Sequence, residues 1–407
     1  MHHHHPDGSL TRRKLFSTIV PAALLVQRAF PQNSADMAER FRKMSEDAER
    51  KGLADPFKGV TGSTGAEPGL FKIQRTGVST ESVRNAAERF LSSLSDDQRK
   101  RTMFAIDDPE WRKWMNQHFY VRQGVSFLEM NDTQRGTAFG LLQSVLSPRG
   151  FELVRNIMRL NETLAELSND HKFLGEWLYF ITVMGKPSAT EPWGFQLDGH
   201  HAILNYFVLG DQVVATPFFT GSEPVTANSG KYKGVSILQK EQDQGLAMLL
   251  ALDGDQRSKA ILNSDKTDNY NVGEAFKDNV VLDYAGVPIS GFSTQRRNQL
   301  LDLIDLYVGA MDEGHARVKM DEVKRHIDHT SFAWIGGSDS SSVYYYRIHS
   351  PVILIEFDHQ RPANLRAMAA NPNLPTRQHI HCVIRTPNGN DYGKDLLRQH
   401  YLKHAHA

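Results

Sequence analysis

The chain has 407 residues, of which 40% are hydrophobic, 23% charged and 9% aromatic. This is the composition of a folded protein rather than a disordered one, and the length suits one large or two medium domains. Lys and Arg together number 47, as do Asp and Glu, so the formal net charge is zero. A neutral chain lacks the overall basic field typical of nucleic-acid binders, so we expect a small-molecule substrate or ligand and no nucleic-acid partner.

Residues 1–35 have the pattern of an export signal. Arg12-Arg13 precedes a mostly apolar stretch, Ser17–Val26, and paired arginines before a short apolar run are typical of twin-arginine export. The run is too short to cross a bilayer, which takes roughly 20 apolar residues, so we expect no membrane span in the mature chain. This predicts a periplasmic or secreted protein. The alternative is a membrane-proximal or disordered N-terminus without a targeting role.

Residues 36–75 are predicted to be a polar segment and linker, with a helix near its start. The part rich in Gly, Pro, Ser and Thr, residues 55–70, is typical of a surface loop. We expect the remainder, residues 76–407, to form a single α+β domain.

The predicted domain begins with helices. Apolar residues recur at three- and four-residue spacing from Val83 to Leu94, which gives one apolar face. A local pattern then recurs in four segments, which contain Ser, Asp, Asn or Thr side chains whose oxygens can cap a helix: 95–99, 131–135, 253–257 and 292–296. We interpret them as four capped helices, with an ancient internal duplication as the weaker alternative. Helical patterning is expected over 136–145, 150–167, 170–177, 236–252, 256–262, 293–311 and 394–404.

Two β-rich regions, near residues 178–220 and 330–386, follow these helical blocks. The order of helices, strands, helices and strands predicts an α+β fold, with a mixed or antiparallel sheet packed by helices. We expect the two β-rich regions to pair into one sheet, which would bring together the histidines that each carries.

The second β-rich region contains His379-Ile380-His381. Side chains alternate along a strand, so both imidazoles project from one face, about 7 Å apart at Cα. That separation lets two rings converge on one metal ion, for which neutral imidazole is a common ligand. The alternative is a pair of hydrogen-bonded or surface histidines. Cys382, the only cysteine, would point to the opposite face and is interpreted as a small buried hydrophobe.

The first β-rich region contributes Asp198-Gly199-His200-His201. Adjacent side chains on a regular strand point to opposite faces, so only one of His200 and His201 would reach a site unless a bulge or turn intervenes. Asp198 is a candidate to orient a ligand imidazole or to act as a base. The alternative is an Asp-Gly turn with exposed histidines.

Glu356 ends a very apolar strand, Val352–Phe357, and Arg385 lies on the predicted histidine-bearing face of its strand. Burial raises the pKa of a carboxyl and suits it to general-base work, and an arginine orients anionic or polar groups of a substrate. The alternative is an ion pair of Glu356 with an arginine. His359 is a possible further member of the site.

The segments 193–201, 351–360 and 379–393 together resemble a bacterial and fungal family, domain of unknown function 3500. The resemblance covers most of the chain after about residue 75. It implies no activity and no catalytic residue, because the family carries no assigned function.

The functional prediction therefore rests on the residues themselves. They predict an exported metal-dependent enzyme that acts in hydrolysis or oxidation. His200, His201, His379 and His381 would hold one divalent ion of zinc, copper or iron, while Glu356, Arg385 and Asp198 would serve catalysis. A non-catalytic periplasmic protein that binds a metal or small ligand is the alternative. A structural protein with hydrogen-bonded histidines is a third possibility.

Overall fold

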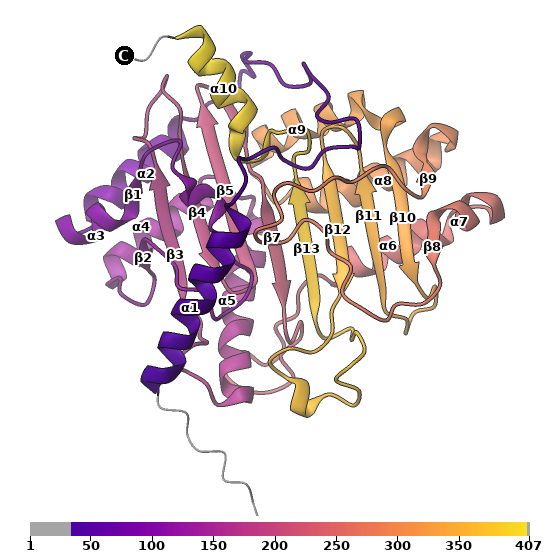
Figure 1. The fold of residues 1–407 in the computed structure, drawn as a ribbon, viewed down its shortest axis with the longest axis horizontal. Coiled ribbons are helices and arrows are strands. Elements are labelled where there is room, and N and C mark those ends of the chain that lie inside the picture. The colour runs from indigo at the N-terminus through magenta and orange to yellow at the C-terminus, as the bar shows by residue number, and fades with distance from the viewer. Residues whose placement is uncertain (1–33, 405–407) are drawn as a thin grey trace, which may run out of the picture. The chain divides into compact units, whose positions relative to one another are not determined.

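The computed structural model describes residues 34–404. The chain divides into a unit of residues 1–40 and a unit of residues 41–407. The export segment predicted for residues 1–35 falls almost entirely outside the described residues and stays a prediction. The second unit is built on one mixed sheet of 13 strands accompanied by helices (Figure 1). The predicted α+β fold is confirmed.

Helices and strands come in blocks along the chain. The α-helices are α1 (Ser34–Gly52), α2 (Glu81–Ser93), α3 (Asp96–Thr102), α4 (Asp132–Gln143), α5 (Pro148–Ser168), α6 (Gln239–Leu250), α7 (Gly254–Ala260), α8 (Thr294–Val308), α9 (Glu313–Arg325) and α10 (Lys394–Lys403). The strands are β1 (Met103–Phe104), β2 (Val125–Ser126), β3 (Tyr179–Met184), β4 (Trp193–Gly199), β5 (Ala202–Leu209), β6 (Gln212–Val214), β7 (Phe218–Ser222), β8 (Ile261–Asn263), β9 (Val287–Pro288), β10 (Ser331–Gly336), β11 (Tyr344–His349), β12 (Leu354–His359) and β13 (Ile380–Arg385).

The two β-rich regions pair into one sheet, as predicted. The strand order is β1-β3-β4-β5-β7-β13-β12-β11-β10-β8, with β2, β6 and β9 beside β3, β5 and β10. The two regions meet where β7 pairs antiparallel with β13. This central pair is therefore where the histidines of the first region can reach those of the second.

The two halves of the sheet share one order of elements. Apart from β6 and short 3-10 turns, each half runs helix, helix, two short strands, helix, helix and four longer strands. In both halves the first short strand pairs in parallel with the first long strand, which begins an antiparallel meander. This correspondence is what an internal duplication produces.

Each of the four predicted segments caps a helix. In each case the side-chain oxygen accepts a hydrogen bond from the backbone N–H three residues further on, which satisfies a first-turn donor. The capping residues are Ser95 for α3, Asn131 for α4, Asp253 for α7 and Ser293 for α8.

Two segments differ from the helices expected from sequence. Residues 170–177 form turns, because Asn169 ends α5 in the left-handed conformation (φ 53°) and no helix restarts. Helix α9 was not anticipated from the pattern. Its buried apolar side chains are only Ala316, Met320 and Val323, too few to stand out among its charged residues.

Side chains alternate along β13, and the two faces of the sheet that they point to are packed by different parts of the chain. Ile380, Cys382 and Ile384 belong to the core cluster that includes α8, and Figure 1 shows α6, α8 and α9 behind this half of the sheet. Cys382 is buried there, in line with its interpretation as a hydrophobe. Val383 belongs to a separate core cluster with Trp111 on the opposite face, which the coil between β8 and β9 crosses.

Within residues 34–404, no helix is long and apolar enough to cross a membrane.

Candidate metal centre

Three histidine side chains converge at one end of the central strand pair. The Nε2 atoms of His379 and His381 lie 3.0 Å apart. Nε2 of His201 lies 3.1 Å from Nε2 of His381 and 3.3 Å from Nε2 of His379. The three residues are only 4–6% exposed. This His201–His379–His381 group could hold a metal ion.

Strand geometry places two of these rings. His379 directly precedes β13 and His381 is its second residue, so both side chains project from one face. Gly221 of β7 lies opposite His381. A Cβ atom at this glycine would lie 3.1 Å from Cδ2 of His381 and 3.2 Å from Cδ2 of His201. The absence of a side chain at position 221 therefore makes room for both rings.

His201 reaches the group from the turn between β4 and β5. Its φ of 66° is left-handed, a conformation that costs most residues about 1–2 kcal/mol. The backbone is held there, because His201 donates its N–H to the Asn116 carbonyl oxygen and accepts from the Gly221 N–H. Such strain commonly marks a functional position.

His200 adjoins the group without joining it. The turn stacks its ring on that of His201, with ring centroids 4.0 Å apart, whereas a regular strand would send the rings to opposite faces. Nδ1 of His200 lies 2.8 Å from Oδ1 of Asn161. Of the four histidines predicted as ligands, the structure thus brings three together, and the fourth packs against them.

Hydrogen bonds around the group determine where its lone pairs point. Nδ1 of His379 lies 2.7 Å from the carbonyl oxygen of Arg361, which can only accept, so this nitrogen carries the hydrogen. Nδ1 of His381 lies 2.8 Å from Oε1 of Glu274 and donates to it when that carboxylate is ionised. With Nδ1 of both rings engaged, the two Nε2 atoms lie 3.0 Å apart, and Nε2 of His201 lies 3.1 and 3.3 Å from them. A metal ion bound among the three nitrogens would accept a lone pair from each.

The electrostatic surroundings keep two of the rings neutral. Burial and the neighbouring histidines lower the pKa values of His201 and His381 well below 6.5. A metal therefore competes with few protons for these nitrogens near pH 7, because metal ions bind the neutral imidazole.

The spacing and the donor set fit a transition metal. Tetrahedral zinc with Zn–N bonds of 2.0–2.1 Å holds its nitrogen ligands roughly 3.3 Å apart, close to the distances within the group. All three donors are imidazole nitrogens. Such a set suits zinc or copper, whereas the common non-haem iron triad includes a carboxylate.

Glu274 supports the group from the coil between β8 and β9. Its side chain is 20% exposed, and burial raises the pKa of its carboxyl. A carboxylate on the far nitrogen of a ligand histidine fixes the tautomer and orientation of the ring. Sequence reasoning missed Glu274, because it belongs to no motif or regular element and only the path of the coil brings it to His381.

Three buried side chains of β12 and β13 hold this coil. Glu356 accepts hydrogen bonds from the N–H groups of Val272 and Gly273, and Asp358 accepts from the two residues before them. Arg385 donates to the carbonyl oxygens of Gly273 and Glu274. Glu356 and Arg385, which were predicted to be catalytic, thus contact the coil that carries Glu274 and not the imidazoles.

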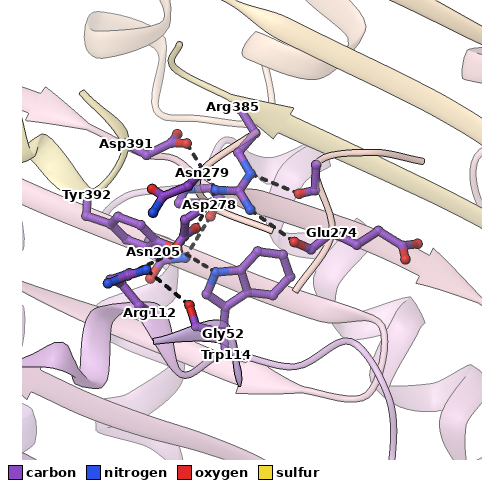
Figure 2. A network of polar contacts seen from close by, with 12 residues as sticks. Gly52, Arg112, Trp114, Asn205, Glu274, Asp278, Asn279, Arg385, Asp391 and Tyr392 are labelled. Carbon is purple, nitrogen blue, oxygen red and sulfur yellow. Dashed lines mark hydrogen bonds and ion pairs between the residues drawn. The ribbon is translucent and has the colours of Figure 1, made fainter. Parts of the chain in front are cut away.

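Arg385 also lies at the centre of a buried ionic network (Figure 2). Its Nη1 lies 2.8 Å from Oδ1 of Asp278 and 3.2 Å from Oδ2 of Asp391. Tyr392 donates to Asp278 and accepts from the Trp114 indole. Burial acts to lower the pKa of Arg385, but the Asp391 and Asp278 carboxylates outweigh it and raise the pKa, so the guanidinium stays protonated.

The two remaining predicted residues are bonded elsewhere. Oδ1 of Asp198 lies 3.2 Å from Nε of Arg122, and burial raises the pKa of Asp198 to about 6. His359 bonds to the backbone of Tyr344 and to the Gln242 side chain.

The fold and site together define a class of protein: an α+β chain with two corresponding half-sheets and a histidine-lined centre where they meet. The chain belongs to the family described as protein of unknown function (DUF3500), whose model matches residues 76–394. No curated protein and no solved structure matches it.

Proposed function

We propose that this protein is an exported metal-dependent enzyme that holds one zinc ion at the His201–His379–His381 group and catalyses a hydrolysis. The observation that carries the proposal is the buried convergence of three imidazole Nε2 atoms, which lie 3.0–3.3 Å from one another. A protein has little reason to bury such an arrangement unless a cation completes it.

The number of ligands supports an enzyme over a binding protein. Among residues 34–404, the group offers three ligand atoms. Structural zinc sites use four protein ligands as a rule, whereas catalytic sites use three and keep one position for water. When bound, zinc would lower the pKa of that water to about 7, which is the chemistry of metal-dependent hydrolases. Copper in the same donor set would suit oxidation instead.

The residues around the group have positioning roles in this proposal. Glu274 and the Arg361 carbonyl oxygen hold hydrogens on the Nδ1 atoms of His381 and His379, which keeps each Nε2 free as a ligand. The ring of Phe219 packs edge-on against His381 at 5.0 Å between centroids and helps to exclude bulk water.

Elemental analysis tests the proposal, with a matched pair of variants. His2–His5 are first replaced by serine, so that this run cannot bind metal. We expect one zinc equivalent in the parent chain and in His200→Ala, and none in His201→Ala. The two residues are adjacent and both 5% exposed, but only the imidazole of His201 belongs to the converging group.

Each other result has a defined meaning. Absence of metal after reconstitution at neutral pH would refute the metal centre, as would equal metal loss in both variants. One equivalent of copper would favour oxidation. Zinc that binds but supports no hydrolysis of ester, amide or phosphate substrates would favour the alternative, a metal-binding protein without catalysis.

Export is the part of the proposal that rests on sequence alone. Arg12-Arg13 before the apolar run supports a periplasmic or secreted location. Replacement of both arginines by lysine keeps the charge and is expected to leave the protein in the cytoplasm, as fractionation would show. Unchanged export of this variant would contradict the twin-arginine route.

A further inference from the structure

Residues 360–379 form the loop that joins β12 to β13 and lies below these strands in the view of Figure 1. This loop carries the Arg361 carbonyl oxygen, which lies 2.7 Å from Nδ1 of His379. An acceptor behind a metal-binding histidine fixes the tautomer and the direction of the ring. The residues that hold Arg361 in place therefore act on the metal centre.

Glu223 holds the loop just beyond Arg361. Its carboxylate accepts hydrogen bonds from three consecutive backbone N–H groups, at 3.0 Å from Ala363, 2.7 Å from Asn364 and 3.4 Å from Leu365. Glu223 directly follows β7 and is only 2% exposed. Successive N–H groups that converge in this way form an anion-binding concavity, and here a side chain of the protein itself occupies it.

The backbone between the residues held by Glu223 and the Arg361 carbonyl oxygen is short and stiff. Pro362 is buried and is the only residue between Arg361 and the held segment, and its ring fixes its φ at about −65°. On the other side, the Arg361 N–H donates to Oδ1 of Asn269 at 2.9 Å. The carbonyl is thus restrained from both directions, and the Glu223 carboxylate supplies one of these restraints.

The same loop also reaches His201 through packed rings. Nδ2 of Asn364 lies 3.3 Å from Nδ1 of His118. The His118 ring packs edge-on against His200, and His200 stacks on His201. Displacement of the loop would therefore also disturb the packing behind a second member of the histidine group.

His381 receives the same kind of support from a different part of the chain. Its Nδ1 partner, Glu274, lies on the coil between β8 and β9, and the buried carboxylate of Glu356 accepts two N–H groups of that coil. In both cases the acceptor behind a ligand ring comes from an irregular segment that a buried carboxylate holds through backbone N–H groups. This repetition argues that Glu223 serves the histidine group and does more than close a loop.

We propose that Glu223 is a positioning residue of the metal centre. Its carboxylate holds residues 363–365, which set the Arg361 carbonyl oxygen behind His379, and this contact presents Nε2 of His379 to the ion. Glu223 is not itself among the ligands of the group. The inference rests on the proposed function, because it concerns the same zinc site.

Two measurements on Glu223→Gln test the proposal, in the full chain with His2–His5 replaced by serine. Glutamine keeps the size of the side chain but places an amide NH2 group where a carboxylate oxygen accepted, so the loop should loosen. Chelator competition should show zinc bound about tenfold more weakly, the lower end of the loss typical of such partners. In metal-free protein labelled with ¹⁵N-histidine, the Nδ1 hydrogen of His379 should exchange rapidly with water, whereas that of His381 should not.

Asp211→Asn is the matched control. The Asp211 carboxylate also accepts hydrogen bonds from consecutive backbone N–H groups, those of Thr76 and Gly77, but it follows the end of β5 that is far from His201. Its replacement should leave zinc affinity and both imidazole signals unchanged. An equal fall in zinc affinity in both variants would show a general loss of stability and would overturn the proposal.

A second variant tests the route from the carboxylate to the ring. Pro362→Gly leaves Glu223 and its N–H partners in place but frees the backbone next to Arg361, and it serves if Glu223→Gln does not fold. It should weaken zinc binding, and the double variant should lose no more than the weaker-binding single variant, because both changes act on one carbonyl oxygen. Additive losses would overturn the proposal, as would unchanged zinc affinity in either single variant or a protected His379 hydrogen in Glu223→Gln.

Failure of this inference is distinguishable from failure of the proposed function. If the parent chain binds no zinc, the proposed function fails. Exchange of the His379 imidazole hydrogen in metal-free protein then still decides whether Glu223 holds the ring in place.

Discussion

The two ends of β13 carry polar clusters on the same face of the sheet, and the clusters differ in how their hydrogen bonds are completed. At the end of the strand, all three guanidinium nitrogens of Arg385 donate to carboxylate or carbonyl oxygens (Figure 2). At the start, the Nε2 atoms of His379 and His381 lie 3.0 Å apart, with Nε2 of His201 beside them. One end is closed by its own residues, and the other carries a three-histidine group that could hold a metal ion.

This difference shows that burial alone does not identify a functional polar residue. Glu356 and Arg385 are both 0% exposed, less than any of the three converging histidines, yet their partners are backbone groups and fixed side chains. A buried cluster that satisfies itself rigidifies the fold, whereas a cluster left incomplete indicates a ligand. Four experiments would break or sharpen the distinction.

The largest effect is expected from Arg385→Leu. Removal of the guanidinium leaves the Asp278 and Asp391 carboxylates buried with less counter-charge, which should lower the free energy of unfolding by about 3–5 kcal/mol. Urea unfolding should show the loss in metal-free protein too. Arg398→Leu, at an arginine whose side chain is 64% exposed, is the control and should change stability little. A small loss in Arg385→Leu would contradict a structural role.

Zinc should stabilise the parent protein and not His379→Ala. At a free zinc concentration of 100 times Kd, a single site adds about 2.7 kcal/mol to the free energy of unfolding. Thermal melts with and without zinc should lose this difference in His379→Ala. His171→Ala, at an imidazole whose side chain is 56% exposed, should keep it. An equal zinc response in all three proteins would show that the ion binds elsewhere.

Glu274→Gln should weaken zinc binding without unfolding the protein. Glutamine still accepts from Nδ1 of His381 but lacks the charge, and loss of such a partner typically costs about 10–100-fold in metal affinity. Competition titration with a chelator measures this. Glu241→Gln, at a buried carboxyl on helix α6, is the matched control and should leave zinc affinity unchanged. Unaltered affinity in Glu274→Gln would remove Glu274 from the centre.

The smallest effect concerns a buried histidine outside both clusters. Burial, followed by the charge of Arg347, lowers the pKa of His349 to about 3. The unfolded chain therefore binds this proton below pH 6.5 while the folded chain does not, so stability falls as the pH drops from 6.5 toward 3. His349→Gln should reduce that slope by up to about 1.4 kcal/mol per pH unit in urea unfolding of metal-free protein. An unchanged slope would show that His349 does not contribute.

Much of the fold could be predicted from sequence because its signals are local. The oxygens of Ser95 and Asp253 cap helices through contacts three residues away, and strand alternation put His379 and His381 on one face. The turn at 170–177 was predicted to be a helix, because its apolar periodicity is misleading. Helix α9 was missed, because its apolar periodicity is faint.

The candidate site was only partly predictable, because its decisive contacts join distant parts of the chain. Three of the four expected ligands converge. Separating His201 from His200 required the left-handed turn, and Glu274 reaches His381 across 107 residues of sequence. The assignments of Glu356 and Arg385 rested on residue type and burial, which cannot distinguish a catalytic group from one that holds a coil.

The sequence by itself determined which residues could serve as ligands and the α+β character of the chain, since both follow from residue type and short-range periodicity. The tertiary structure alone decided which imidazoles meet. The β7–β13 pairing, the missing side chain at Gly221 and the coil held by Glu356 and Arg385 set that geometry. Convergence of lone pairs within about 3 Å depends on long-range packing, and no local pattern in the chain encodes it.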